Sequence, residues 1–170
     1  GLGTPGQEAA LPIPNNHEGW GRVDVGAATA GDRDFHDGDL LTTGFSASYN
    51  HDVHDSAQPF KVTLAWSDAP ASLAAPGLVN NLDLVVVAPG GTTYRGNNLS
   101  GGWSLPGGFA DGTNNVESVY IQNPALGTWT VRVEGTNVPQ GPQPLAVLLT
   151  GALNPPINYD HQAYLPLITK

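Results

Sequence analysis

The chain has 170 residues, no cysteine and a formal net charge of −9. The acidic balance argues against nucleic acid and anionic membranes as partners, and the lack of cysteine excludes a disulfide framework and thiol chemistry. With 22 glycines, 15 prolines and 12% charged residues, the composition indicates one all-β domain with many turns, and no apolar run is long enough to span a membrane.

Residues 1–14 are mostly glycine, proline and small residues without apolar periodicity, and are interpreted as a linker or a tail lying on a surface. The pattern of residues 15–25 alone is also compatible with a turn followed by a short strand. The acidic run GDRDFHDGD follows at residues 31–39. An EF-hand calcium loop does not fit this run, because His36 would stand at its third ligand position and Asp37 where a glycine is required. We therefore expect a solvated acidic loop.

Residues 40–153 carry the alternation of apolar and polar side chains that is typical of half-buried strands. Trp66 and Trp129 fall on the apolar side of their strands, so both are expected in the core. The expected strands are one strand or a bent pair within 40–53, followed by strands at 60–66, 82–87, 116–121, 128–133 and 145–149. Some seven to eight antiparallel strands without a substantial helix predict an all-β sandwich.

The connections between these strands differ in length. Long loops are expected at 67–81, 95–115 and 135–143, and short turns at 88–92 and 123–127. If each strand reverses the direction of the one before it, the three long loops gather at one end of the sandwich. The two short turns then lie at the other end.

Two histidines lie at the end of the first expected strand region. His51 and His54 lie three residues apart beside Asp52 and Asp55, a composition that could hold zinc. Residues three apart on a strand point to opposite faces, however, so the two imidazoles would diverge. A hydrated turn is the expected structure of this segment.

Four separated motifs carry a resemblance to a known family. They are VTLAWSDAPAS, LVNNLDLVVVAPGGTTYRGN, NNVESVYI and NVPQGPQP, which begin at residues 62, 78, 114 and 137. In this order they resemble the C-terminal jelly-roll domain of subtilisin-like serine proteases (subtilases). The resemblance implies a jelly-roll β-sandwich over residues 40–153 and a C-terminal tail over residues 154–170. It also implies that residues 1–39 are a linker and the trailing segment of an upstream catalytic domain, because NNHEGWGRVDV resembles the end of that domain.

The chain is not expected to be an enzyme itself. Subtilases use a Ser-His-Asp triad whose serine sits at a helix start containing Gly-Thr-Ser, and no such motif occurs here. The resemblance therefore implies a non-catalytic accessory domain of a secreted serine endopeptidase. Such a domain would stabilise the protease or help it engage protein substrate, with the upstream catalytic domain as its partner.

Two other functions remain open from the residues alone. A carbohydrate-binding module would use exposed aromatic rings, and among the four tryptophans only Trp103, in a loop, is a credible stacking platform. The other alternative is an extracellular adhesion or structural module.

The strongest site prediction is a calcium site where the long loops gather. Asp68 follows the strand at 60–66, Asn80 and Asp83 begin the next strand, and Asn115 and Glu117 return to the same end. Calcium takes six to eight oxygen ligands from carboxylates, amides and backbone carbonyls, which suits this set. The resemblance supports calcium, although related domains tend to read NDLDL where this chain reads NNLDL. The alternative is that these side chains only cap turns.

Overall fold

The computed structural model describes residues 15, 19–21, 23, 25, 26, 33–72 and 77–151. Apart from two helical residues, Val25 and Gly26, the regular structure of these described residues is entirely strand. The strands are β1 (Arg33–Leu41), β2 (Ser46–Val53), β3 (Phe60–Ala65), β4 (Asn81–Val87), β5 (Thr93–Arg95), β6 (Leu99–Ser100), β7 (Trp103–Ser104), β8 (Val116–Ile121), β9 (Gly127–Asn137) and β10 (Gln143–Thr150).

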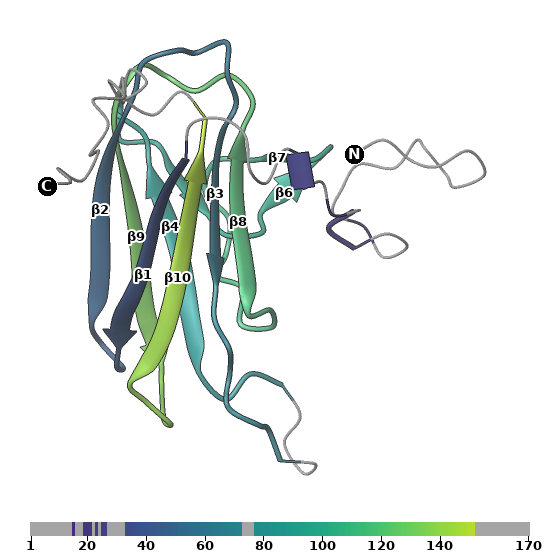
Figure 1. Cartoon of the computed structure of the whole chain (residues 1–170), viewed down its shortest axis with the longest axis vertical. Helices are drawn as coiled ribbons and strands as arrows, with labels where there is room; N and C mark the ends of the chain where they lie inside the picture. Colours follow the sequence, from purple (N-terminus) through teal and green to yellow (C-terminus); the bar gives the residue numbers. More distant parts are fainter. Residues whose placement is uncertain are drawn as a thin grey trace, which may run out of the picture.

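Eight of these strands form two four-stranded sheets that pack face to face (Figure 1). One sheet has the order β1-β10-β3-β8 and the other β2-β9-β4-β5, and every pairing is antiparallel. Consecutive strands from β1 to β4 lie in alternate sheets, and so do β8, β9 and β10, which is the jelly-roll arrangement. The predicted jelly-roll fold is confirmed.

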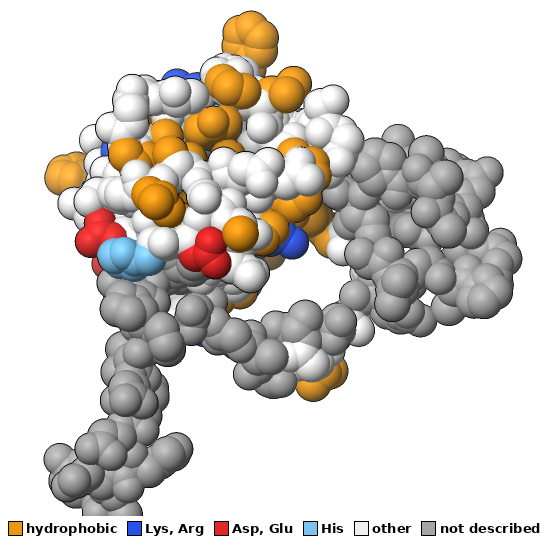
Figure 2. Space-filling view, turned by 90° about the horizontal axis from the view of Figure 1, so that it is seen from above, with side chains coloured by type: hydrophobic (Ala, Val, Ile, Leu, Met, Phe, Trp, Pro, Cys, Tyr) orange, Lys and Arg blue, Asp and Glu red, His pale blue; other side chains and the backbone are white. Residues whose placement is uncertain are grey.

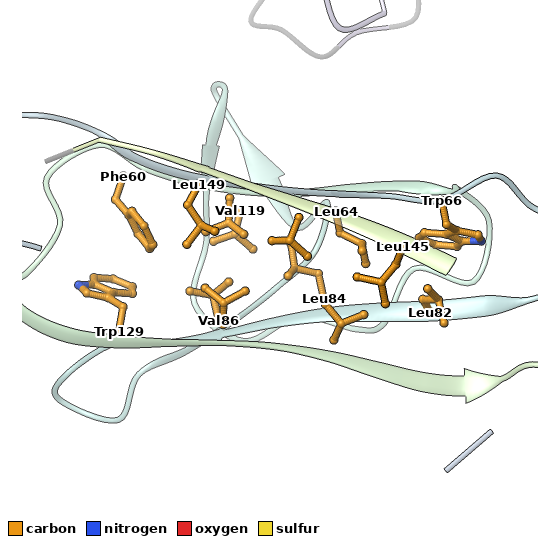
Figure 3. Packing of buried hydrophobic residues seen from close by; sticks show 14 of the residues in the cluster. Phe60, Leu64, Trp66, Leu82, Leu84, Val86, Val119, Trp129, Leu145 and Leu149 are labelled. Carbon is orange, nitrogen blue, oxygen red and sulfur yellow. The ribbon is translucent and has the colours of Figure 1, made fainter. Parts of the chain in front are cut away.

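The apolar positions of both sheets point into the space between them. Phe60 of β3 faces Trp129 of β9, with ring centroids 5.3 Å apart (Figure 3). Trp66 and Trp129 are buried, as their strand positions predict. The fully buried apolar residues include Val62, Leu64, Leu82, Leu84, Val86, Val119, Val131, Val133, Val147 and Leu149.

The loops gather as the alternation of strand direction predicts. Gln143 donates from Nε2 to the carbonyl of Ser67 (3.1 Å), and the amide of Trp66 donates to the carbonyl of Asn115 (3.2 Å). Contacts therefore join loops 67–81, 95–115 and 135–143 at one end of the sandwich. At the other end, the turn at 88–92 meets the start of β9, because a Cβ on Gly127 would lie 3.3 Å from Pro89.

The acidic segment before residue 40 is not the loop that was expected. Residues from Arg33 onward form β1, which pairs with β10 from Arg33 opposite Thr150 to Leu41 opposite Gln143. The expectation was wrong because the inward-facing positions of this edge strand carry Asp34 and His36 in place of apolar residues, so the sequence lacks the usual alternation. β1 begins ahead of the domain boundary expected at residue 40. The tail at 154–170 lies outside the described residues.

The two sheets leave the sandwich open along its sides. β1 and β2 are the edge strands on one side, and β8 and β5 are the edge strands on the other. We call these the β1/β2 edge and the β5/β8 edge. Seen from above, few charged side chains are visible among the hydrophobic and uncharged atoms at the end of the sandwich (Figure 2).

Candidate metal sites

Asp68 acts as a cap for the loop that follows β3. Its Oδ1 accepts hydrogen bonds from the amides of Ala69 and Asn80, both at 2.8 Å, and its Oδ2 accepts one from the amide of Val79 at 2.7 Å. Three backbone donors therefore already surround this carboxylate. The arrangement is that of a turn-capping aspartate, which was the alternative to a calcium ligand.

Asn80 and Asn115 also hold loops together. The buried Asn80 side chain donates to the carbonyl of Gln140 (2.9 Å) and to Oε1 of Gln143 (2.8 Å), and it accepts from the amide of Gln140 (3.0 Å). Asn115 donates from Nδ2 to the carbonyl of Trp66 (2.9 Å). These amides cross-link the loop ends, and the Asn80 oxygen is already used.

Asp83 and Glu117 are different, because each is buried and keeps one carboxylate oxygen without a partner. Oδ1 of Asp83 and Oε1 of Glu117 make no hydrogen bond, and neither does the buried Oδ1 of the nearby Asn81. The second oxygen of Asp83 accepts from the hydroxyl of Thr136. Buried oxygens without partners are costly, so this part of the molecule is where an additional ligand is most expected.

Glu117 lies at the β5/β8 edge and reaches across to the other sheet. It projects from β8 and accepts through Oε2 a hydrogen bond from the amide of Leu84 in β4 (2.8 Å). The glycine that follows β5 makes room for it, since a Cβ on Gly96 would lie 2.0 Å from Oε2. The carboxyl thus satisfies a strand amide at the point where the chain leaves β5.

Burial raises the pKa of Glu117 to about 8. The hydrogen bond from Leu84 opposes this increase, while the negative charges of Asp83 and Asp111 add to it. The side chains of Asp83 and Asp111 are therefore close enough to act electrostatically on Glu117.

Asp111 anchors the long loop beside this edge. Burial acts to raise its pKa, but hydrogen bonds from the side chains of Asn97 and Asn114 and from backbone amides outweigh burial, and its pKa lies below the ordinary value. Asn97 continues the network, donating to the carbonyl of Val116 (2.9 Å) and accepting from the amide of Ser118 (3.0 Å).

A second polar cluster, which sequence reasoning missed, lies at the β1/β2 edge. Nε2 of His36 and Nε2 of His51 are 3.2 Å apart, and Oδ2 of Asp34 lies 3.2 Å from Nδ1 of His51 and 3.6 Å from Nε2 of His36. Within the described ranges, it is the one group of three His, Cys, Asp or Glu residues whose ligand atoms all lie within 4.8 Å of one another. His54, which the sequence placed with His51 in a hydrated turn, is exposed and takes no part. His51 is instead a buried residue of β2.

Burial lowers the pKa of His51, and the charge of Asp34 partly opposes that effect. The imidazole of His51 is only 6% exposed, whereas the side chains of His36 and Asp34 are 28% and 43% exposed. The cluster is therefore buried at His51 and reachable by solvent at His36 and Asp34.

Trp103, the expected sugar-stacking platform, is only partly exposed in β7. The ammonium of Lys61 lies 5.9 Å from the centre of its ring and 5.2 Å from that of Tyr120. A cation over the ring competes with a sugar for the same position.

The comparisons with known proteins link the chain to proteases. It is 34% identical over 103 residues to the Serine protease/ABC transporter B family protein tagA of Dictyostelium discoideum, an alignment of 58% of this chain and 6% of the relative. It is 36% identical over 93 residues to the Serine protease/ABC transporter B family protein tagB of the same organism, an alignment that covers 52% of this chain and 5% of the relative. The chain thus spans about one twentieth of the length of these curated relatives.

No protein-family model matches the chain. A crystal structure of a protein from Sulfurospirillum deleyianum aligns over 74% of this chain and 99% of its own, with 8% identity and a TM-score of 0.40, which is too low to support an inference. Among the described residues, no helix is long and apolar enough to cross a membrane.

Proposed function

We propose that this chain is a non-catalytic accessory domain of a subtilisin-like serine protease that acts outside the cell. The observation that carries the proposal is the similarity of about half the chain to proteins named as serine proteases. The jelly-roll strand order is the one that the resemblance to subtilase C-terminal domains implies. The domain stabilises the catalytic unit or helps it to engage protein substrate.

Contacts on the outer face of one sheet support attachment to a preceding domain. Trp20, which precedes the sandwich, packs edge-on against Tyr120 of β8, with ring centroids 6.4 Å apart. On the same sheet, Phe35 and Leu148 are cross-strand partners and remain 57% and 37% exposed. Exposed apolar pairs of this kind are suited to contact with a neighbouring domain.

The accessory role is tested by expressing the parent polypeptide whole and with residues 33–151 deleted. We expect peptidase activity that a serine-directed inhibitor blocks, and faster thermal inactivation after the deletion. The isolated chain should hydrolyse no casein. Inhibitor-sensitive hydrolysis by the isolated chain would contradict the proposal, and so would a parent polypeptide without peptidase activity.

We further propose that calcium binds at the β5/β8 edge, with Asp83 and Glu117 as carboxylate ligands and Asn81 beside them. These three residues keep the buried oxygens that lack partners. A divalent cation would offset the charge that burial makes unfavourable, and backbone carbonyls would complete its coordination. Asp68, Asn80 and Asn115 then serve to hold the loops around the ion.

Calcium at about one hundred times its dissociation constant is expected to add about 2.7 kcal/mol to the free energy of unfolding. For a domain of this size, that corresponds to a rise in melting temperature of roughly 8–12 °C. Thermal unfolding after chelation, and after return of calcium or magnesium, measures the effect. Asp83→Asn should remove most of the calcium-dependent rise, whereas Asp37→Asn, on the exposed face of β1, should keep it. A melting temperature that chelator and calcium leave unchanged would exclude the site.

A further inference from the structure

We propose that Asp34, His36 and His51 form a binding site for a divalent transition metal of the zinc type at the β1/β2 edge. The site lies on the opposite side of the sandwich from the calcium site proposed above and does not depend on the protease role. Two imidazole nitrogens and one carboxylate oxygen are donors that suit zinc and its neighbours in the first transition row better than calcium or magnesium.

The spacing of the donor atoms fits such an ion. Zinc bonds to nitrogen and oxygen are about 2.0–2.2 Å long, so two ligands of a tetrahedral ion lie about 3.3–3.5 Å apart. One donor atom of each of the three residues lies within 4.8 Å of the other two. The Nε2 atoms of His36 and His51 are 3.2 Å apart, and Oδ2 of Asp34 is 3.6 Å from Nε2 of His36 and 3.2 Å from Nδ1, the other ring nitrogen, of His51. An ion can therefore be placed between these donors with small movements of the side chains.

The scaffold holds the three side chains in place before an ion arrives. Asp34 and His36 are two apart on β1 and share its inward face, while His51 projects from β2 of the other sheet. Tyr49, also on β2, stacks on the ring of His36 with centroids 4.0 Å apart and planes 13° apart. The hydroxyl of Tyr49 donates to Asp39, which fixes the stacking ring in turn.

Apolar core residues flank the cluster within the two sheets. Directly opposite on the neighbouring strands are core residues, namely Leu149 beside Asp34, Val147 beside His36 and Trp129 beside His51. Buried apolar neighbours limit the movement of the ligands. They also lower the local dielectric constant, which strengthens the interaction of the ligands with a cation. The exposed side chain of Asp34 leaves an approach from solvent.

Three protein ligands leave a fourth position for water or another small ligand, as in zinc sites that are open to substrate. The competing explanation is a metal-free hydrogen bond, in which one Nε2–H of the histidine pair donates to the other ring while Asp34 accepts from Nδ1 of His51. That arrangement accounts for the same distances, so metal binding has to be measured directly.

The experiment uses the untagged chain, stripped with chelator and titrated with ZnCl₂ by calorimetry, with elemental analysis of the dialysed complex. We expect one zinc ion per chain at this site, unaffected by excess calcium. His36→Ala and His51→Ala should each weaken binding more than about 100-fold, since loss of an outer partner of a ligand alone costs 10–100-fold. His54→Ala is the matched control, because His54 is exposed just beyond β2, and it should bind like the wild type.

Cobalt(II) gives a second measurement that does not depend on affinity alone. Bound Co²⁺ should show the intense visible bands of a tetrahedral site, and His36→Gln should abolish them. Asp34→Asn, at an exposed side chain, covers the case in which the buried His51 variant fails to fold, and circular dichroism checks each variant. No zinc bound by the wild type would overturn the proposal, as would binding that survives both His36→Ala and Asp34→Asn, or binding that is lost equally in His54→Ala.

Discussion

Replacing Glu117 by glutamine is expected to stabilise the metal-free protein at alkaline pH by as much as about 5 kcal/mol. The pKa of Glu117 is about 8 in the folded protein, against an ordinary value of 4.5 in the unfolded chain. Each pKa unit corresponds to about 1.4 kcal/mol, so the difference sets the upper limit. Glutamine stays neutral at every pH and can still accept the hydrogen bond from Leu84.

The sign follows from proton binding. Between about pH 4.5 and pH 8, the folded protein keeps the proton on Glu117 and the unfolded chain releases it. The stability linked to this carboxyl is therefore fully present below pH 4.5, falls as the pH rises, and is lost above pH 8. Asp111 acts in the opposite sense, because its lowered pKa makes its contribution disappear as the pH falls.

Urea unfolding from pH 4 to pH 9 in chelator, on the wild type and on Glu117→Gln, isolates the Glu117 contribution, because Asp111 is common to both proteins. The difference in free energy of unfolding should be near its minimum at pH 4 and should grow up to pH 8. In saturating calcium, the order should reverse at pH 8, since glutamine lacks the charge that the ion requires. A variant less stable than the wild type at pH 8 in chelator would refute the raised pKa.

Replacing Trp129 by alanine is expected to cost about 3–5 kcal/mol of stability, which is the range for removing a large aromatic side chain from a core. Trp129 is 1% exposed, its ring lies 5.3 Å from that of Phe60 and 6.0 Å from that of Tyr94, and its Nε1 donates to the carbonyl of Ala125 (2.8 Å). The substitution leaves a cavity between the two sheets, and it also leaves the carbonyl of Ala125 without its hydrogen-bond donor.

Trp103→Ala is the matched control for this loss, because Trp103 is only partly buried in the β6–β7 hairpin. It should cost roughly a third as much or less. Trp129→Phe should fall between the two, since it keeps an aromatic ring but loses the indole hydrogen bond. Equal losses for Trp129→Ala and Trp103→Ala in urea unfolding would show that the core is not centred where the two sheets meet.

The strands with a regular apolar alternation could be predicted from the sequence. β3, β9 and β10 carry large apolar side chains at every second position over residues 60–64, 129–133 and 145–149, and the structure buries those positions. β1 could not be predicted in the same way, because its inward side is polar at Asp34 and His36. Its place is fixed by hydrogen bonding to β10, a contact between residues that are more than one hundred positions apart in the chain.

The same limit applies to the sites. The sequence motifs that contain Asp83 and Glu117 predicted ligands at two residues that are buried and keep oxygens without partners. The motifs could not separate these two residues from Asp68, because the path of the loop decides whether backbone amides donate hydrogen bonds to a carboxylate. The pair His36 and His51 was missed because two edge strands of different sheets bring them together, whereas sequence reasoning compared neighbours such as His51 and His54.

The pairing of β1 with β10 has a mechanical consequence. These are the first and last strands of the sandwich, and Arg33, where the first begins, lies opposite Thr150, where the last ends. Tension applied through the flanking segments therefore acts across the strands at one end of the pair, and the hydrogen bonds of an antiparallel pair pulled in this way open one after another, like a zipper. The domain should yield to a pulling force by peeling β1 away at low force, which would open the β1/β2 edge while the other strands stay paired.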